Sequence, residues 1–408
     1  MGKRILFVWM GIVLLSAASL AGETRRVESP NPEAAIRLAE GLLDRVDDAI
    51  WGLSEIPDVE VKTVYRANEK TGTFVNHPQL AFFKDQMYCA FQLCPVGEDS
   101  TDSVSVYSRS ANLNKWPPPE IIGPPTTNDT FRASVGWLQY GDRLHALILR
   151  RDDSPPGEVT VTEYRTTTDG KTWSDLNVLL PEMMGGESAR AITPGGRVLF
   201  LGHGHRVEDG TAAHKACSYY HDGDNFSRGW KESAYPQELV LYASGKKPIA
   251  RIIEASWFRR PNGELVLVSR DLLRSGYVFA ATSRDRGESW GESLLTNIPD
   301  SSNMQCAGNL PDGTCYLITT PGRVDKKGSN LQPRTPLVLW LSDDGILFDR
   351  AFLIRSTPPP RRFEGKSKTV GYSYVGSLVH DGFLYISYAT NKEDIEMSCI
   401  PLAALEKR

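Results

Sequence analysis

A carboxylate inside an apolar run is the most informative single residue of this sequence. Glu254 lies in RIIEASWF, where most of the flanking side chains are apolar. Burying a carboxylate is unfavourable unless a partner compensates its charge. We therefore expect Glu254 to have a polar partner and a functional role.

Two histidines form a second candidate site. The run LGHGH places His203 and His205 on the same side of a strand, because side chains alternate between faces. With His77 they could bind a metal, act as acid and base in a lyase or an unusual glycosidase, or have a structural role. Two histidines without a nearby cysteine or defined carboxylate are a weak metal signal. We predict no metal site and no cofactor.

The six cysteines match no zinc-binding spacing. Export would permit disulfides, and buried free thiols fit the sequence equally well, so no pairing is predicted. The cysteines are Cys89, Cys94, Cys217, Cys306, Cys315 and Cys399.

The composition gives no reason to expect a nucleic-acid partner. The 408 residues carry a formal net charge of −4 and contain no long basic run.

The N-terminus has the layout of a secretory signal. Lys3 and Arg4 precede the apolar run ILFVWMGIVLL, and SAASLAGE then offers small residues with a cleavage point after Ala21. The alternative is a retained membrane anchor, for which the apolar run is short. We predict a signal peptide over residues 1–21, a secreted or periplasmic protein, and no stable membrane insertion after cleavage.

The elements that must position these residues are strands. Residues 31–50 have helical spacing of apolar residues, with Asn31 as a cap, inside an N-terminal segment over 22–57. From residue 58 the period changes to two, in runs such as RLHALILRR, ELVLVSRD and FLYISYAT, separated by turns such as PGG, PNG and PDG. An all-β barrel, sandwich or propeller follows.

A repeated turn decides among these folds. The stretch TSRDRGESW ends at Trp290, and looser copies are TTTDGKTW, YYHDGDNF, LSDDGILF and RSANLNKW. Their terminal aromatic residues recur about every 58 residues, close to the size of a four-stranded propeller blade. Six such units would fill most of the propeller domain that we predict over residues 58–408.

These repeats resemble the Asp boxes of the sialidase superfamily, whose fold is a six-bladed β-propeller. Over residues 60–402 the chain is similar to secreted bacterial sialidase-like proteins with BNR repeats. The resemblance implies an all-β six-bladed β-propeller with Asp-box hairpins, preceded here by a short N-terminal helix. Asp boxes also occur in proteins that are not sialidases, so function must be argued from the pocket.

The resemblance implies three catalytic residues. Tyr374 in GYSYVGSLVHDG matches the nucleophile, with Tyr372 as second choice, and Glu254 matches the base that activates it. Asp99 in VGEDSTDS matches the acid on a loop of the first blade, with Glu98 and Asp102 as rivals.

The resemblance also implies a site for a substrate anion. Arg270 and Arg334 match two of the three arginines that hold the sialic acid carboxylate in this family. The first arginine is missing, because Asn76 in VNHPQL stands at its position, and Arg132 could replace it from the neighbouring blade. Further binding residues expected at the starts of inner strands are His77, Glu187 and Tyr372.

Three functions are consistent with these residues. The first is an exported, exo-acting, retaining glycoside hydrolase acting on sialylated or other acidic glycans, or on a neutral sugar if the missing arginine matters. The second is a polysaccharide lyase or a histidine-dependent glycosidase on the same fold. The third is a non-catalytic propeller that binds glycans. In each case the expected partner is a glycan or polysaccharide.

Overall fold

The structure is a computed structural model that describes residues 30–43, 50–126, 130–152, 159–208, 211–223, 225–235, 240–241, 249–250, 252–322 and 333–406. The predicted signal peptide, residues 1–21, lies outside the described residues.

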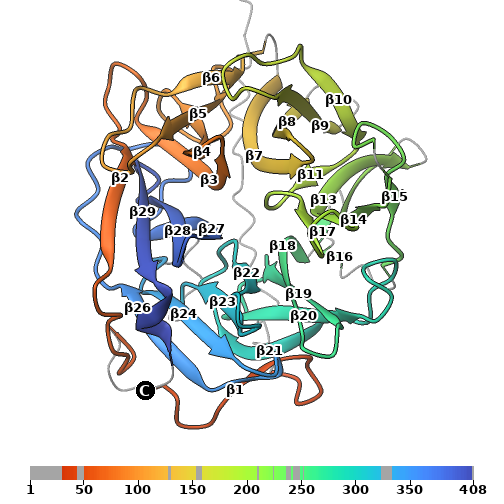
Figure 1. The fold of residues 1–408 in the computed structure, drawn as a ribbon, viewed down its shortest axis with the longest axis vertical. Coiled ribbons are helices and arrows are strands. Elements are labelled where there is room, and N and C mark those ends of the chain that lie inside the picture. The colour runs from red at the N-terminus through yellow and green to blue at the C-terminus, as the bar shows by residue number, and fades with distance from the viewer. Residues whose placement is uncertain are drawn as a thin grey trace, which may run out of the picture.

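Six antiparallel sheets surround a central axis as the blades of a propeller, which confirms the predicted all-β six-bladed fold (Figure 1). Five blades have four strands, and the third has five because its inner edge is formed by two short strands. From the axis outwards, blade 1 consists of β3 (Phe74–Phe83), β4 (Gln86–Cys94), β5 (Val104–Ser110) and β6 (Glu120–Gly123). Blade 2 consists of β7 (Thr130–Tyr140), β8 (Arg143–Asp152), β9 (Val159–Thr167) and β10 (Asn177–Pro181). Blade 3 consists of β11 (Met184–Gly185) with β12 (Arg190–Ala191), then β13 (Val198–Glu208), β14 (Thr211–His221) and β15 (Lys231–Glu232).

Blades 4 to 6 complete the ring in chain order, with one exception in the last blade. Blade 4 consists of β18 (Ile252–Arg259), β19 (Leu265–Asp271), β20 (Tyr277–Ser283) and β21 (Leu294–Pro299). Blade 5 consists of β22 (Cys306–Asn309), β23 (Cys315–Thr319), β24 (Leu337–Ser342) and β26 (Arg350–Arg355). Blade 6 consists of β27 (Tyr372–His380), β28 (Phe383–Thr390), β29 (Asp394–Pro401) and β2 (Glu60–Tyr65). The short remaining elements are β1 (Arg37–Leu38), β16 (Val240–Leu241), β17 (Ile249–Ala250), β25 (Leu347–Phe348) and the 3-10 helix η1 (Leu402–Leu405).

The exception in blade 6 closes the ring. Its outermost strand β2 comes from the start of the propeller and pairs antiparallel with β29 near the end of the chain. The two ends of the propeller domain are thereby held in one sheet.

Apolar side chains fill the spaces between neighbouring blades. Between blades 1 and 2, Trp137 packs against Tyr88 and Tyr107 with ring centroids 5.7 and 6.1 Å apart. Comparable clusters lie between the other neighbouring blades. Because both faces of each blade are covered, strands such as β24 are buried along their whole length.

The predicted N-terminal helix is wrong over residues 30–43, which form turns and the short strand β1; residues 44–49 lie outside the described residues. Strand β1 runs parallel to β25, and its Leu38, together with Ile36 just before the strand, packs into the core between blades 4 and 5. Asn31 accepts a hydrogen bond from the Glu33 backbone N–H at 2.8 Å, which closes a turn rather than a helix. These apolar residues therefore pack as part of a strand at the edge of a sheet and do not form the face of a helix.

Three outer hairpins contain an aspartate that accepts backbone N–H groups of its own turn. The Asp169 carboxylate accepts those of Lys171 and Thr172, each at 2.8 Å. Asp344 does the same with the residues two and three positions on, at 2.7 and 2.9 Å, whereas Asp285 accepts the N–H of Ser289, four positions on, at 2.9 Å. Such bonds fix the turns locally.

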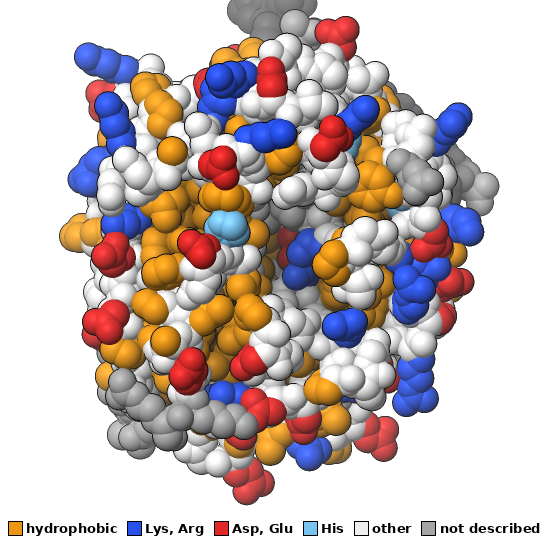
Figure 2. Space-filling model, in the orientation of Figure 1, with side chains coloured by type: hydrophobic (Ala, Val, Ile, Leu, Met, Phe, Trp, Pro, Cys, Tyr) orange, Lys and Arg blue, Asp and Glu red, His pale blue; other side chains and the backbone are white. Residues whose placement is uncertain are grey.

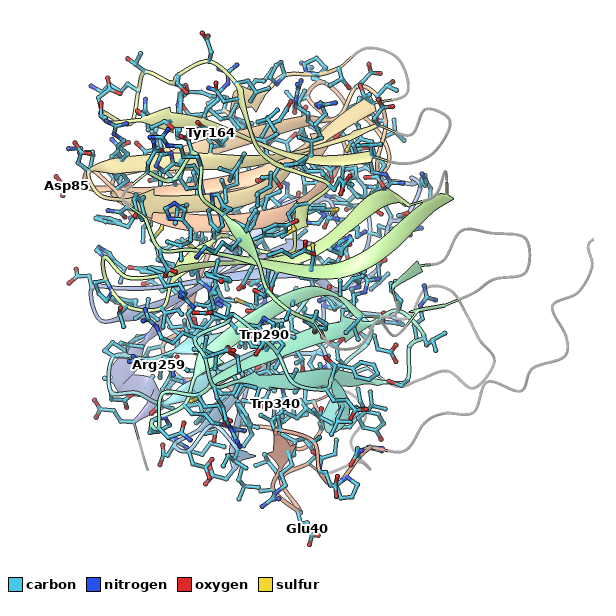
Figure 3. All side chains as sticks on the ribbon, turned by 90° about the vertical axis from the view of Figure 1, so that its right-hand side faces the viewer. Glu40, Asp85, Tyr164, Arg259, Trp290 and Trp340 are labelled. Atoms are coloured by element: carbon cyan, nitrogen blue, oxygen red, sulfur yellow. The ribbon has the colours of Figure 1, made fainter. Side chains whose placement is uncertain are left out.

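The turns of the ring divide between two ends. Asp85, in the turn after β3, and Arg259, at the end of β18, lie at one end (Figure 3). Figure 2 shows that end, with charged side chains of both signs scattered over it and a hollow near its centre. The first residues of the inner strands β3, β18 and β27 therefore lie toward the opposite end, which we call the mouth.

All six cysteines are described, are buried and form no disulfide. The described residues contain no helix with the length and apolar character that a membrane crossing requires.

Candidate active site

Three inner strands carry a bulge at equivalent positions near the mouth. The register shifts in β3, β18 and β27 lie at His77, Glu254 and Tyr374. Each of these residues has a positive φ, of 53°, 52° and 55°. Bulky side chains seldom adopt this conformation, and it concentrates at functional sites. A bulge re-aims a side chain, and here it brings three distant residues together.

A single guanidinium connects Tyr374 with Glu254. Arg270 Nη1 donates to the Glu254 carboxylate at 2.7 Å and to the Tyr374 hydroxyl oxygen at 3.4 Å. Among the described residues, no hydrogen bond joins the hydroxyl to the carboxylate directly. Arg270 Nε also donates to the Ser302 hydroxyl at 3.2 Å, which fixes the plane of the guanidinium.

Burial and charge set opposite protonation states for the two acids. Burial, and then the Glu254 carboxylate, raise the pKa of Tyr374, so this phenol is neutral. Burial alone would raise the pKa of Glu254, but the Arg270 guanidinium outweighs it and holds that pKa below its ordinary value. An ionised carboxylate and a neutral phenol are thus held on one cation.

Further groups surround the Tyr374 ring. The His77 ring lies against it with centroids 4.1 Å apart. The Arg334 guanidinium carbon and the Lys392 Nζ lie 5.3 and 5.2 Å from the ring centroid. Arg334 Nη1 is buried and has no hydrogen-bond partner among the described residues. Within the described part of the chain, the carboxylates paired with these cations are Glu254 and Glu98, so a negatively charged group entering here would meet an excess of positive charge.

Two adjacent carboxyls at the mouth differ in charge. Glu98 Oε1 accepts from Asn76 Nδ2 at 2.7 Å and from Lys392 Nζ at 2.8 Å. Burial opposes ionisation of Glu98, but Lys392 prevails and lowers its pKa to about 2. Burial and the neighbouring Glu98 instead raise the pKa of Asp99 to about 6, against the weaker effect of Arg151, whose Nη1 is 3.9 Å away. Asp99 is therefore the carboxyl able to hold a proton near neutral pH.

Comparison with known families now bears on this arrangement of blades and side chains. Residues 85–386 match the BNR repeat-like domain family. The chain belongs to that family. A search of curated proteins finds no match to the sequence.

Solved structures place this BNR-repeat protein on the sialidase fold. A protein described as a sialidase shares 18% identity with a TM-score of 0.55, covering 90% of this chain and 35% of its own, so our chain spans about a third of that protein. Trypanosoma rangeli sialidase in complex with sialic acid shares 12% identity with a TM-score of 0.60, covering 87% of this chain and 60% of its own. A Dyadobacter fermentans protein of unknown function shares 17% identity with a TM-score of 0.61, covering 85% of this chain and 100% of its own. At these identities the likeness concerns the fold.

Three predicted binding residues of this BNR-repeat protein are engaged elsewhere. Arg132 turns outward to Glu163 on β9, at 2.7 Å, so it does not replace the missing arginine. Tyr372 is fully buried in the cluster between blades 5 and 6, because the bulge that turns Tyr374 to the axis leaves its neighbour in the core. Glu187 binds Arg190 and the Ser256 hydroxyl, both at 2.7 Å, and joins blade 3 to blade 4.

The histidine hypothesis divides in the same way. His77 lies at the mouth, where burial lowers its pKa to about 4, so its ring is neutral. His203 is buried on β13, the second strand of blade 3, and the side chain of His205 lies outside the described residues. The described residues contain no group of three or more histidine, cysteine or acidic side chains arranged to hold a metal ion.

Sequence reasoning missed Lys392, whose side chain is only 3% exposed. It follows β28 in the turn YATNKEDIE, which reads as an ordinary exposed turn. Its approach to Glu98 joins residues 294 positions apart, which no local pattern of the chain records.

Two cavities of the structure lie away from the mouth. Two cavities of about 700 and 770 Å³ are both bordered by Arg259 and therefore lie at the other end of the ring. Their linings contain none of the residues that surround Tyr374.

Proposed function

We propose that this BNR-repeat protein is an exported, exo-acting, retaining glycoside hydrolase that removes a terminal acidic sugar, with sialic acid as the leading candidate. The observation that carries the proposal is the shared Arg270 Nη1, which holds the Tyr374 hydroxyl and the Glu254 carboxylate in one group. The three aspartate turns are assigned to the Asp boxes of the sialidase superfamily, which supports the fold assignment but not the activity.

The first step forms a covalent intermediate. As the Tyr374 oxygen bonds to the anomeric carbon, its proton passes to Glu254 and the bond to the leaving oxygen breaks. Asp99 protonates that oxygen. A tyrosine suits a sugar whose anomeric carbon carries a carboxylate, because a negatively charged nucleophile would be repelled. Arg270 stabilises the developing phenolate through the hydrogen bond that it already makes.

The second step releases the sugar. Asp99, now ionised, takes a proton from water as the water oxygen attacks the anomeric carbon. The bond to Tyr374 breaks, and Glu254 returns the proton to the phenolate. Two displacements at one carbon give net retention of configuration.

Turnover of an aryl α-sialoside by the purified protein tests the proposal. Tyr374→Phe and Glu254→Gln should each lower kcat by at least about a hundredfold. Tyr372→Phe is the matched control, because it deletes a hydroxyl two residues away inside the core. NMR of the first product formed should show the anomer of the substrate. Wild-type turnover in both site variants would refute the mechanism, and sugar binding without turnover by the wild type would favour a non-catalytic propeller.

One observation favours a second candidate, a polysaccharide lyase. The neutral His77 ring contacts Tyr374, so the two could remove a proton from the sugar ring and protonate the leaving oxygen in an elimination. Such a reaction leaves a carbon–carbon double bond in an acidic sugar. A new ultraviolet absorbance on incubation with acidic polysaccharides, abolished in His77→Ala, would replace the hydrolase proposal.

A further inference from the structure

We propose that Lys392 supplies the third positive charge of the site for the substrate anion, in place of the arginine missing at Asn76, and that Glu98 holds it there. The inference rests on the proposed function, because it names how that site recognises an acidic sugar.

The position of Lys392 is the first argument. Its backbone carbonyl accepts the Val75 N–H at 3.0 Å, so it lies against the start of β3, next to Asn76. Its Nζ reaches the ring of Tyr374 at 5.2 Å and the ring of Phe74 at 5.4 Å. A side chain from blade 6 thus brings a cation to the part of blade 1 from which the arginine is absent.

The company of Lys392 is the second argument. With Arg270 and Arg334 it forms a group of three cations around one tyrosine. Arg270 is paired with Glu254 and Lys392 with Glu98, while the Arg334 guanidinium, among the described residues, donates to the Ser302 carbonyl at 3.3 Å. Repulsion within the group contributes to lowering the pKa of Lys392, after burial. A bound carboxylate would relieve that repulsion and offer an acceptor to Arg334.

Glu98 and Asn76 explain why the ammonium stays in place. Both Asn76 Nδ2 and Lys392 Nζ donate to the same Glu98 oxygen, at 2.7 and 2.8 Å. A buried lysine without a carboxylate would lose its charge or leave the site. The ammonium has three N–H donors, and the one side-chain hydrogen bond that it makes within the described residues, to Glu98, uses one of them.

A lysine recognises an anion differently from an arginine. The guanidinium offers a planar fork that matches a carboxylate at two points, whereas the ammonium is a point charge with rotatable donors. The Lys392 contribution therefore depends on the charge of the substrate more than on the plane of its carboxylate.

The test compares an aryl α-sialoside with the methyl ester of its carboxylate. Lys392→Met should lower the ratio of kcat/KM for the acid to kcat/KM for the ester about tenfold or more, because any change in the protonation of Asp99 affects both substrates alike and cancels in the ratio. The control is Lys115→Met, an exposed lysine in the outer turn of blade 1, which should change neither substrate. Equal effects on acid and ester, or no effect on the acid, would overturn the inference.

Folding and function are separated by two further measurements. Lys392→Met leaves Glu98 unpaired, so the double variant Lys392→Met/Glu98→Gln, checked by thermal melting, repeats the comparison without a buried lone charge. Calorimetric binding of free sialic acid to wild type and variant is the readout without turnover. Binding that depends on Lys392 in a protein that cleaves nothing would sustain the inference and sink the hydrolase. Cleavage with unchanged discrimination would do the reverse, and neither binding nor cleavage would sink both.

Discussion

Glu98 and Asp99, two adjacent residues at the mouth, have pKa values shifted in opposite directions by their surroundings. Lys392 keeps Glu98 ionised, and that fixed negative charge, added to burial, favours the protonated form of Asp99. A paired carboxylate thus tunes an acid beside it, a common way of setting a proton donor near neutral pH. The roles of acid and anchor follow from this division.

The Asp99 assignment predicts how the rate depends on pH. The acid must be protonated to act and its pKa is about 6, so kcat/KM should fall as the pH rises through about 6. Asp99→Asn should abolish this limb and slow substrates with poor leaving groups more than those with good ones. Initial rates of both proteins with two aryl leaving groups, measured from pH 4 to 8, check it. A falling limb that persists in the variant would assign the acid elsewhere.

At this scale the sequence predicts types of residue better than partners. The isolation of Glu254 in an apolar run indicates that it needs a partner, and the structure provides Arg270 at 2.7 Å. No sequence feature near Asp99 distinguishes it from Glu98, because the difference in their pKa values depends on Lys392, which is close in space but 294 positions from Glu98 in the sequence.

The elements contribute through bulges and through aromatic residues on the outer hairpins. Trp290, which follows the Asp285 turn, is 3% exposed and donates its indole N–H to the Ser218 hydroxyl of blade 3 at 2.9 Å. Trp173 reaches from blade 2 to the Tyr107 hydroxyl of blade 1 in the same way, at 3.1 Å. Each hairpin therefore anchors its blade to the preceding one.

Replacing such an anchor should cost stability without altering the chemistry. Trp290→Ala should lower the free energy of unfolding by about 3–5 kcal/mol. Trp116→Ala, at a partly exposed aromatic of blade 1, should cost less. Urea denaturation of both variants checks the difference, and KM should be unchanged in each. Equal losses at the two sites would contradict the anchoring role.

The repeated turns predicted the blades well, because their aromatic spacing reflects the size of one sheet. The bulges could not be predicted in this way. Gly136 marks the bulge in β7, whereas the bulges in β3, β18 and β27 have His77, Glu254 and Tyr374 at φ values of 52–55° and no glycine at that position. The packing of the whole ring imposes these backbone conformations, and the local sequence does not predict them.

At the scale of the molecule, β2 closes the ring by completing blade 6 with a strand from the start of the propeller. Val64 on this strand is 5% exposed and packs in the cluster between blades 6 and 1, while Val61 is 42% exposed. The mouth depends on this closure, because Tyr374 comes from blade 6 and His77 from blade 1.

Two substitutions on β2 should therefore differ sharply. Val64→Asp should destabilise the protein by about 3–5 kcal/mol, since it buries an unpaired charge at the closure. Val61→Asp should stay within about 0.5 kcal/mol of wild type. Thermal melting and limited proteolysis would check this, and comparable losses would show that β2 is dispensable for closure.

The spacing of the repeated turns predicted six blades correctly, whereas the apolar spacing in the N-terminal segment predicted a helix where the structure has turns and a short strand. The apolar residues within 31–50 have spacing that fits a helix in isolation, but Ile36 and Leu38 pack between blades 4 and 5, against residues far away in the sequence. Partners distant in sequence decided the structure of that segment.

The buried thiols have a practical consequence. Cys399 faces Glu60 across the β2–β29 ladder, and the other five cysteines are distributed over blades 1, 3 and 5. An alkylating reagent can react with each sulfur only while its own part of the ring breathes open. Mass spectrometry of the alkylated protein would show which cysteine is modified first. The order of modification would identify the part of the ring that opens first, with no need for an added probe.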